Sequence, residues 1–333
     1  MKRASLAPLG RLLFAGLVAG LVAGAALAPI GADAQIAGGK TLHMIVPFPP
    51  GGPADVLGRV VADGLAEAFQ QTAIVDNRTG AAGNIGVEAI ARGPADGSTM
   101  GIVPAGNIAV NPSLFPVLPY KASELAPVAM LGTVENVLVV GMSVPANNLK
   151  ELLALATAKP GTLSFASAGA GSQAHLAGEL LQLDTGVQMI HVPYKGTGPA
   201  LTDLIGGQVT MMFAQLSSAL PQIRAGKLRA IGLASAKRNA LIPDVPTIAE
   251  QGVARFEAVS WYALMVPAAT PKDVIDRLNA ETNKLLARPQ TREKLAAVGL
   301  DVASGPPEQL ARTIQVETAR WSEVVRQRHL KPE

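Results

Sequence analysis

Residues 41–55 read TLHMIVPFPPGGPAD, and this stretch decides how the rest of the chain is interpreted. Residues 41–46 are mostly apolar and run into a Pro/Gly-rich turn at 47–53, which predicts a short strand followed by a tight turn. From 54 to 69 apolar residues recur at helical spacing. Those that share one helix face are Val56, Leu57, Val60, Val61 and Leu65. Strand, turn and amphipathic helix in this order are typical of an α/β fold.

The same unit recurs further along the chain. Strands are predicted at 100–103, 163–167 and 189–192, and they are followed by turns at 104–107, 168–171 and 193–198. The last two turns lead into helices, one at 172–183 and one with Pro199 in its first turn. Further helices are predicted at 149–158, 271–286, 289–298 and 306–328. We therefore expect an α/β fold with a parallel or mixed sheet.

Two longer apolar segments, 128–142 and 256–267, are interpreted as paired strands that cross between two lobes. Lobe 1 would comprise residues 35–136 plus 258–333, and lobe 2 would be the inserted segment 137–257. Two crossovers would form a hinge with a ligand cleft between the lobes. A single elongated domain is the alternative that the pattern leaves open.

Residues 1–34 have the pattern of a secretory signal peptide. A basic start precedes an apolar run from Leu12 to Ile30, and Ala32-Asp33-Ala34 offers a cleavage site after Ala34. A retained membrane anchor is the competing interpretation. Cleavage would give an exported protein, located in the periplasm of an organism with two membranes.

Composition excludes several classes of function. The chain of 333 residues contains no cysteine, so disulfides, Cys-ligated metals and thiol nucleophiles are excluded. Without residues 1–34, which contain Lys2, Arg3, Arg11 and Asp33, the 28 basic and 25 acidic residues fall to 25 and 24, a net charge of +1. No basic stripe is visible, and we expect no nucleic-acid partner.

Three Gly-rich turns, at 48–52, 168–172 and 196–198, precede predicted helices. At the carboxyl ends of strands, such turns bring unpaired helix N-terminal amides to one edge of a sheet, where they can bind an anion. The alternative is that the glycines only make tight turns. Ser172 could cap its helix or bind a ligand, His175 is more often structural in such a position, and capping is favoured for Asp55.

Enzyme signatures are weak in this chain. The sequence GAGSQA at 169–174 matches a dinucleotide-binding pattern, but the acidic partner expected after the next strand is replaced by Pro193-Tyr194-Lys195. No G-x-S-x-G motif occurs, and the histidines lack metal-ligand spacing. We expect no catalytic residue, no metal and no cofactor.

Three segments resemble the Bug-type receptors of tripartite tricarboxylate transporters. They are IVPFPPGGPAD at 45–55, VDNRTGAAGNIG at 75–86 and HVPYKGTGPALTDL at 191–204. The resemblance covers nearly the whole chain after the leader and implies a two-lobed periplasmic binding protein, type II-like, that closes on a small carboxylate. It also implies integral-membrane transporter subunits as partners.

The ligand-binding residues implied by the resemblance lie in both lobes. They are Phe48, Pro49, Pro50, Gly51, Gly52, Pro53, Ala54, Ser167, Ala168, Ser172, Gly196, Thr197, Gly198, Pro199 and Ala200, with Asn107 and Gln215 less firmly placed and Asp55 and His175 as further candidates.

The ligand class stays open between di- or tricarboxylates, acidic amino acids and aromatic acids. Thr79, where the family commonly has Pro, and Gln215, where it often has Asn, depart from the family pattern. Two alternatives also stay open: a sensory module that docks on a sensor kinase, and an exported enzyme acting on a carboxylate.

Overall fold

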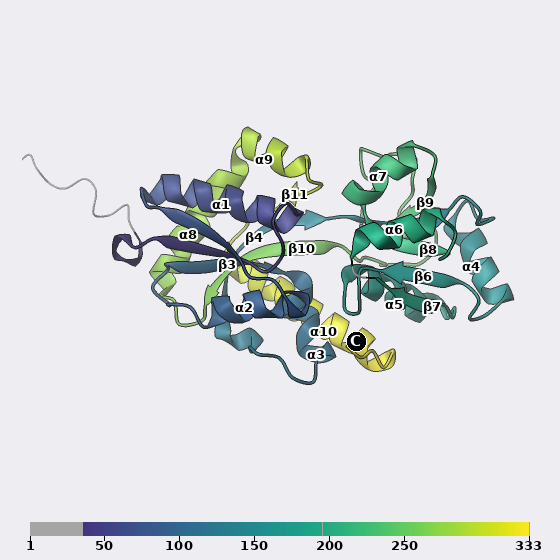
Figure 1. Cartoon of the computed structure of the whole chain (residues 1–333), viewed down its shortest axis with the longest axis horizontal. Helices are drawn as coiled ribbons and strands as arrows, with labels where there is room; N and C mark the ends of the chain where they lie inside the picture. The colour runs from purple at the N-terminus through teal and green to yellow at the C-terminus, as the bar shows by residue number, and fades with distance from the viewer. Residues whose placement is uncertain (1–35, 195, 333) are drawn as a thin grey trace, which may run out of the picture. The chain divides into compact units, whose positions relative to one another are not determined.

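The computed structural model describes residues 36–194 and 196–332. The predicted signal peptide lies outside the described residues. Two β-sheets, each flanked by helices, organise the described chain (Figure 1), and this confirms the predicted α/β class. No helix in this part of the chain is long and apolar enough to cross a membrane.

The first sheet, sheet A, has six strands in the order β11-β4-β10-β3-β1-β2. Its strands are β1 (Leu42–Val46), β2 (Ala73–Asn77), β3 (Thr99–Pro104), β4 (Leu125–Val134), β10 (Ser260–Pro267) and β11 (Asp301–Val302). β1 pairs in parallel with β2 and β3, whereas β10 is antiparallel to both β3 and β4. The carboxyl ends of β1, β2 and β3 therefore meet at one edge.

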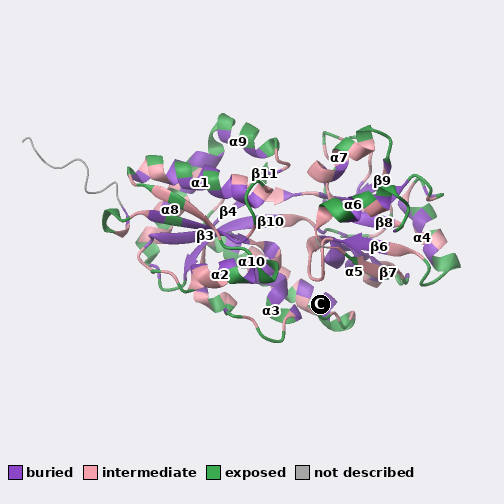
Figure 2. Cartoon of the chain, in the orientation of Figure 1, coloured by how far each residue is buried: buried purple, intermediate pink, exposed green. Residues whose placement is uncertain are grey.

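Helices cover both faces of sheet A. The helices on one face are α1 (Pro53–Phe69), α8 (Lys272–Ala287) and α9 (Pro289–Ala296), and those on the other are α2 (Asn84–Ala91), α3 (Asn111–Leu114) and α10 (Pro307–Gln327). The predicted apolar face of α1 is buried at Leu57, Val60, Val61 and Leu65, while Val56 is half-buried. Figure 2 shows the strands buried between green, exposed helix faces. Each fully buried Leu or Val side chain contributes about 1.5–3 kcal/mol to the stability of this core.

The second sheet, sheet B, has five strands in the order β7-β6-β8-β5-β9. Its strands are β5 (Asn136–Gly141), β6 (Ser164–Ser167), β7 (Ile190–Pro193), β8 (Met211–Gln215) and β9 (Leu228–Leu233). The helices around it are α4 (Leu149–Ala158), α5 (Gln173–Thr185), α6 (Thr197–Ile205) and α7 (Leu216–Arg224). β6 is parallel to β7 and β8, so the turns that follow these three strands lie at the same edge of the sheet.

The chain crosses between the sheets twice. β4 and β10 pair antiparallel, as predicted for the crossover strands. The prediction of one continuous strand at 128–142 is wrong, because β4 ends at Val134 and β5 begins at Asn136. Glu135 separates them: its carbonyl accepts a hydrogen bond from the Leu216 amide, and its carboxylate accepts one from Asn239 Nδ2 at 2.8 Å.

The second crossover is tied to the first by Asn136. Its side-chain amide donates to the Ala258 carbonyl at 2.7 Å, and its own carbonyl accepts from the Ala234 amide. The strand predicted at 256–267 begins only at Ser260, because the backbone of Ala258 bonds to Ala234 rather than to sheet A. The lobe boundaries remain predictions.

Most predicted helix ends agree with the structure to within two residues. The irregular loop predicted at 104–107 is wrong. β3 runs to Pro104, and a π-helical turn at Gly106–Val110 follows almost at once and continues into α3. The buried side chain of Asn107 fixes this turn through contacts with distant residues, described below.

Candidate functional site

The first predicted turn, at 47–53, joins β1 to α1, and the helix already begins at Pro53. Gly51 has φ +91°, a conformation that favours glycine, whereas Gly52 is extended at φ −82° and caps the helix. A Cβ at either glycine would have no neighbour within 4 Å. Pro53 has no N–H group, and the Asp55 amide donates to the Gly52 carbonyl at 3.0 Å, so Ala54 supplies the first amide of α1 that lacks an intrahelical acceptor.

The buried side chain of Asp55 is hydrogen-bonded to the backbone of this turn. Its carboxylate is 4% exposed and accepts from the Gly51 amide at 3.0 Å, Asn77 Nδ2 at 2.9 Å and Arg59 Nε at 3.0 Å. Burial raises the pKa of Asp55, but these hydrogen bonds and the Arg59 charge outweigh it and lower the pKa overall. Asn77 also donates to the Phe48 carbonyl at 3.0 Å. Asp55 thus shapes the turn from within the protein.

Asn107 is 3% exposed and belongs to a buried polar cluster. Its Nδ2 donates to the Ala82 carbonyl and to Asn84 Oδ1, and Asn84 Oδ1 also accepts from Asn111 Nδ2 at 2.7 Å. The Tyr120 hydroxyl donates to the Asn107 carbonyl at 2.6 Å, and burial raises the pKa of Tyr120 to about 12. The sequence analysis did not predict this cluster, although Asn84 belongs to the family motif at 75–86.

The second predicted turn, residues 168–172, joins β6 to α5. Gly169 and Gly171 have φ +120° and +73°, and Ser172 is the N-cap of α5, its Oγ accepting from the His175 amide at 3.4 Å. Ser167 is fully buried, and its hydroxyl accepts from the Gly169 amide at 3.1 Å. Ser167 therefore stabilises the turn by a hydrogen bond inside the protein.

Two histidines lie under the second turn. His175 Nδ1 accepts from the Gly171 amide at 3.1 Å, and His191 Nε2 lies 2.7 Å from Ser167 Oγ. Their rings stack at 3.8 Å with an interplanar angle of 11°. Burial, with a smaller contribution from His191, lowers the pKa of His175 to about 3, and burial lowers the pKa of His191 to about 4. Both rings are neutral at pH 7.

The third predicted turn joins β7 to α6. Gly196 has φ +111° and caps α6, and a Cβ at Gly196 or Gly198 would have no neighbour within 4 Å. Ala200 is buried, so it supports the helix from inside rather than facing the open space. Lys195 lies outside the described residues. Tyr194 next to it donates its hydroxyl to Asp203 Oδ2 at 2.8 Å.

Contacts connect the predicted turns across the two sheets. A Cβ at Gly83 would lie 3.3 Å from both Phe48 and Asn107, and one at Gly106 would lie 3.9 Å from the Gly171 carbonyl oxygen. In sheet B, the Tyr194 amide donates to the Ser167 carbonyl at 3.0 Å. The Gly106–Val110 turn thus lies near the first turn, through Gly83, and near the second turn, and the third turn adjoins the second.

Gln215 ends β8 and precedes α7, within reach of sheet A. Burial raises the pKa of the Tyr262 hydroxyl on β10, and a hydrogen bond with Gln215 opposes this rise.

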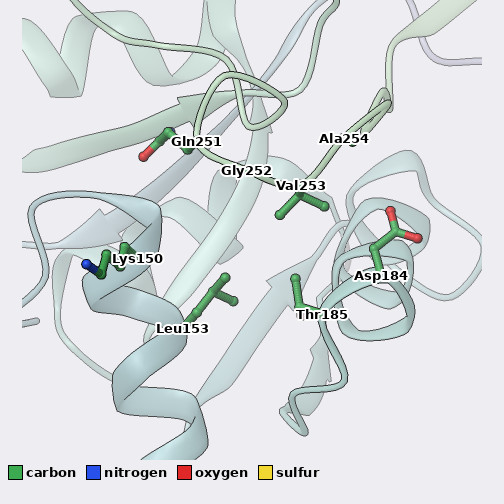
Figure 3. Close-up of a pocket in the computed structure, with 8 residues that line it drawn as sticks. All are labelled: Lys150, Leu153, Asp184, Thr185, Gln251, Gly252, Val253 and Ala254. Atoms are coloured by element: carbon green, nitrogen blue, oxygen red, sulfur yellow. The ribbon is translucent and has the colours of Figure 1, made fainter.

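Two cavities lie away from these turns. One of about 530 Å³ is lined by residues of α4, of the end of α5 and of the 251–254 turn, among them Lys150 and Asp184 (Figure 3). Another of about 490 Å³ lies over β1 and β2, next to Arg78 and Arg92. Neither is lined by a predicted ligand-binding residue. Among the described residues, no group of three or more His, Cys, Asp or Glu side chains is arranged to hold a metal ion.

Solved structures define the class of protein. The structure of R. palustris Rpa4515 with adipate has a TM-score of 0.78 at 33% identity, covering 88% of this chain and 98% of that one. Periplasmic binding protein BugD has a TM-score of 0.74 at 32% identity, with 88% and 99% covered. MatC (Rpa3494) from Rhodopseudomonas palustris with bound malate has a TM-score of 0.74 at 32% identity, with 86% and 98% covered. The chain has the fold of a periplasmic binding protein.

Sequence comparison then gives the family. The model of the tripartite tricarboxylate transporter family receptor matches residues 57–330. Protein BugT of Bordetella pertussis (strain Tohama I) is 42% identical over 302 residues, which is 90% of this chain and 92% of BugT. The chain belongs to this family of solute-binding receptors, and the Bug-type resemblance is confirmed.

Proposed function

We propose that this receptor captures a small organic dicarboxylate in the periplasm and delivers it to a tripartite tricarboxylate-type membrane transporter. The observation that carries the proposal is the open space beside the glycines at the N-termini of α1 and α6. A carboxylate placed there would accept hydrogen bonds from helix amides and interact with the positive end of the helix dipole.

The chemistry of the turns suits an anion without a charged clamp. Residues 48–54, 167–172 and 196–200 contain no charged side chain. The Asp55 carboxylate behind the first turn is paired with Arg59, so it does not present an uncompensated negative charge to the ligand. Backbone donors then supply the recognition of each carboxylate.

The choice of a dicarboxylate rests on the relatives. Adipate is present in the solved Rpa4515 structure and malate in the MatC structure, and both are dicarboxylates. Two helix N-termini from two different sheets, α1 and α6, match a ligand with two carboxylates. Binding would draw together the lobes proposed at 35–136 plus 258–333 and at 137–257, and the closed form would dock on the membrane subunits.

A thermal-shift screen of the refolded protein tests this function, since unfolding first removes any retained ligand. Adipate, malate, citrate, glutamate, benzoate and neutral diamide analogues would be compared. A ligand at one hundred times its Kd stabilises the folded state by about 2.7 kcal/mol, which raises the melting temperature by several degrees. A rise with dicarboxylates and none with the diamides is expected. No response to any carboxylate would contradict the proposal, and mass spectrometric detection of altered ligand would indicate an enzyme.

A further inference from the structure

The second turn is connected to the C-terminal end of the chain by polar side chains, of which His175 and Glu179 are buried and Arg328 is partly exposed. The connection begins at Gly171, whose amide donates to His175 Nδ1 at 3.1 Å. A backbone amide can only donate, so Nδ1 carries no hydrogen and the neutral ring carries its hydrogen on Nε2. In this tautomer the Nε2–H group of His175 can donate, and the nearest carboxylate is that of Glu179.

Glu179 lies one helical turn further along α5. Its Oε1 is 3.8 Å from His175 Nε2, and the whole residue is 5% exposed. Its Oε2 accepts from Arg328 Nε at 2.6 Å. A carboxylate this deeply buried needs a cation, so the orientation of Glu179 depends on Arg328.

Arg328 is the C-cap residue of α10, a helix that covers sheet A. It directly follows α10, which packs against β4 of sheet A, and Ser322 Oγ of α10 lies 2.5 Å from Ser113 Oγ. The yellow C-terminal end of α10 reaches α5 in Figure 1. Arg328 therefore holds a sheet B residue from an anchor on sheet A.

We propose that Arg328 is a positioning residue for ligand binding, which acts through Glu179 and His175 to set the Gly171 peptide in the second turn. This inference rests on the proposed function. Without Arg328, Glu179 would lose its cation and reorient, and the Nε2–H group of His175 would lose the carboxylate charge 3.8 Å away. The ring, still stacked on His191, would then shift relative to the Gly171 amide that it accepts from.

The test measures adipate affinity by calorimetry and the imidazole ¹⁵N resonances of His175 by NMR, with and without ligand. Arg328→Gln is compared with Arg326→Gln, because Arg326 lies two residues earlier, in the last turn of α10, and pairs with Glu323 at an exposed position. We expect Arg328→Gln to weaken adipate binding about tenfold and to shift the His175 resonances even without ligand. Arg326→Gln should change neither.

The double variant Arg328→Gln/His175→Asn adds a second criterion. If both residues act through one connection, it should bind adipate no more weakly than His175→Asn alone. Should Arg328→Gln fail to fold, Glu179→Gln keeps the side-chain shape, removes the carboxylate charge and should shift the same resonances.

The outcomes separate this inference from the proposed function. If the wild-type protein binds neither adipate nor malate, the dicarboxylate proposal is wrong, and the His175 resonances alone decide whether Arg328 positions the turn. Unchanged resonances in Arg328→Gln overturn the inference whatever the affinity. Shifted resonances with unchanged adipate affinity also overturn it, since the turn would then not need this positioning.

Discussion

The first and second turns each have a glycine amide that donates to a buried side chain, but the two acceptors differ in charge. A buried carboxylate, Asp55, accepts from the Gly51 amide in the first turn, whereas neutral imidazoles support the second through Gly171 and Ser167. Asp55 contacts residues 4 and 22 positions away, while the second turn's support extends over the 149 positions between Glu179 and Arg328. The first turn is a local structure of sheet A, and the second depends on both sheets.

The largest expected effect comes from removing the carboxylate. Asp55→Ala leaves the Gly51 amide without an acceptor and removes one of the two acceptors of Asn77 Nδ2, the other being the Phe48 carbonyl. We expect the free energy of unfolding to fall by about 3 kcal/mol. Urea unfolding measures this change. Asp63→Ala, at an exposed position of the same helix, is the control and should change little. A loss below about 1 kcal/mol for Asp55→Ala would show that the first turn does not need its carboxylate.

The variants Gly52→Val and Gly198→Val compare the two helix N-termini, α1 and α6, at which we propose that the ligand binds. Both sites are open and neither has a positive φ, so the side chain would enter the ligand space without straining the fold. Adipate affinity should fall about 100-fold in each variant, while the melting temperature without ligand changes little. Gln290→Val, at the exposed second position of α9, is the matched control. Unchanged affinity in either variant would remove that helix from the site.

Acid should affect the imidazole-supported turn. The folded pKa values of His175 and His191, about 3 and 4, lie below the unfolded value near 6.5. Between pH 6.5 and about 4 the unfolded chain binds more protons, so the histidine contribution to stability is present above pH 6.5 and is lost as pH falls. Unfolding measured from pH 7 to 4.5 should show an excess of one to two protons.

A histidine variant locates the origin of that slope. His191→Gln should reduce the excess by about one proton. A slope that survives in His191→Gln would assign the acid sensitivity to other groups.

The smallest effect is expected at the helix caps. Ser172 caps α5 with its side chain, whereas Gly52 caps α1 without one. Ser172→Ala should lower the free energy of unfolding by about 0.5–1 kcal/mol, and Ser172→Thr should restore most of the loss. An equal loss in both variants would mean that the hydroxyl does not stabilise the cap.

Local patterns allowed the sequence to predict a large part of the fold. α4 lies where helical spacing placed it, at Leu149–Ala158, and the strand-turn-helix units recur as expected. The break at Glu135 was missed because the apolar run continues on both sides of it. Only the pairing of β4 with β10 and of β5 with β8 shows that adjacent residues belong to different sheets.

The side chains that hold the turns of the candidate site could not be predicted from the sequence, for a different reason. The turns and their glycines are contiguous in sequence, so their residue types could be interpreted directly. The Asn84, Asn107, Asn111 and Tyr120 cluster and the Arg328–Glu179 pair join residues far apart in the chain. Nothing in the local sequence around Arg328 indicates a partner on α5.

The position of β10 constrains the order in which the molecule folds. β10 lies between β3 and β4 in the middle of sheet A, yet it follows the whole of sheet B in the chain, and the Asn136–Ala258 contact spans 122 positions. When the chain is synthesised from its N-terminus, all strands of sheet B are available before β10. Sheet B can therefore form while sheet A still lacks a central strand. Closing so long a loop slows folding, so the insertion of β10 should be a slow step in the formation of sheet A.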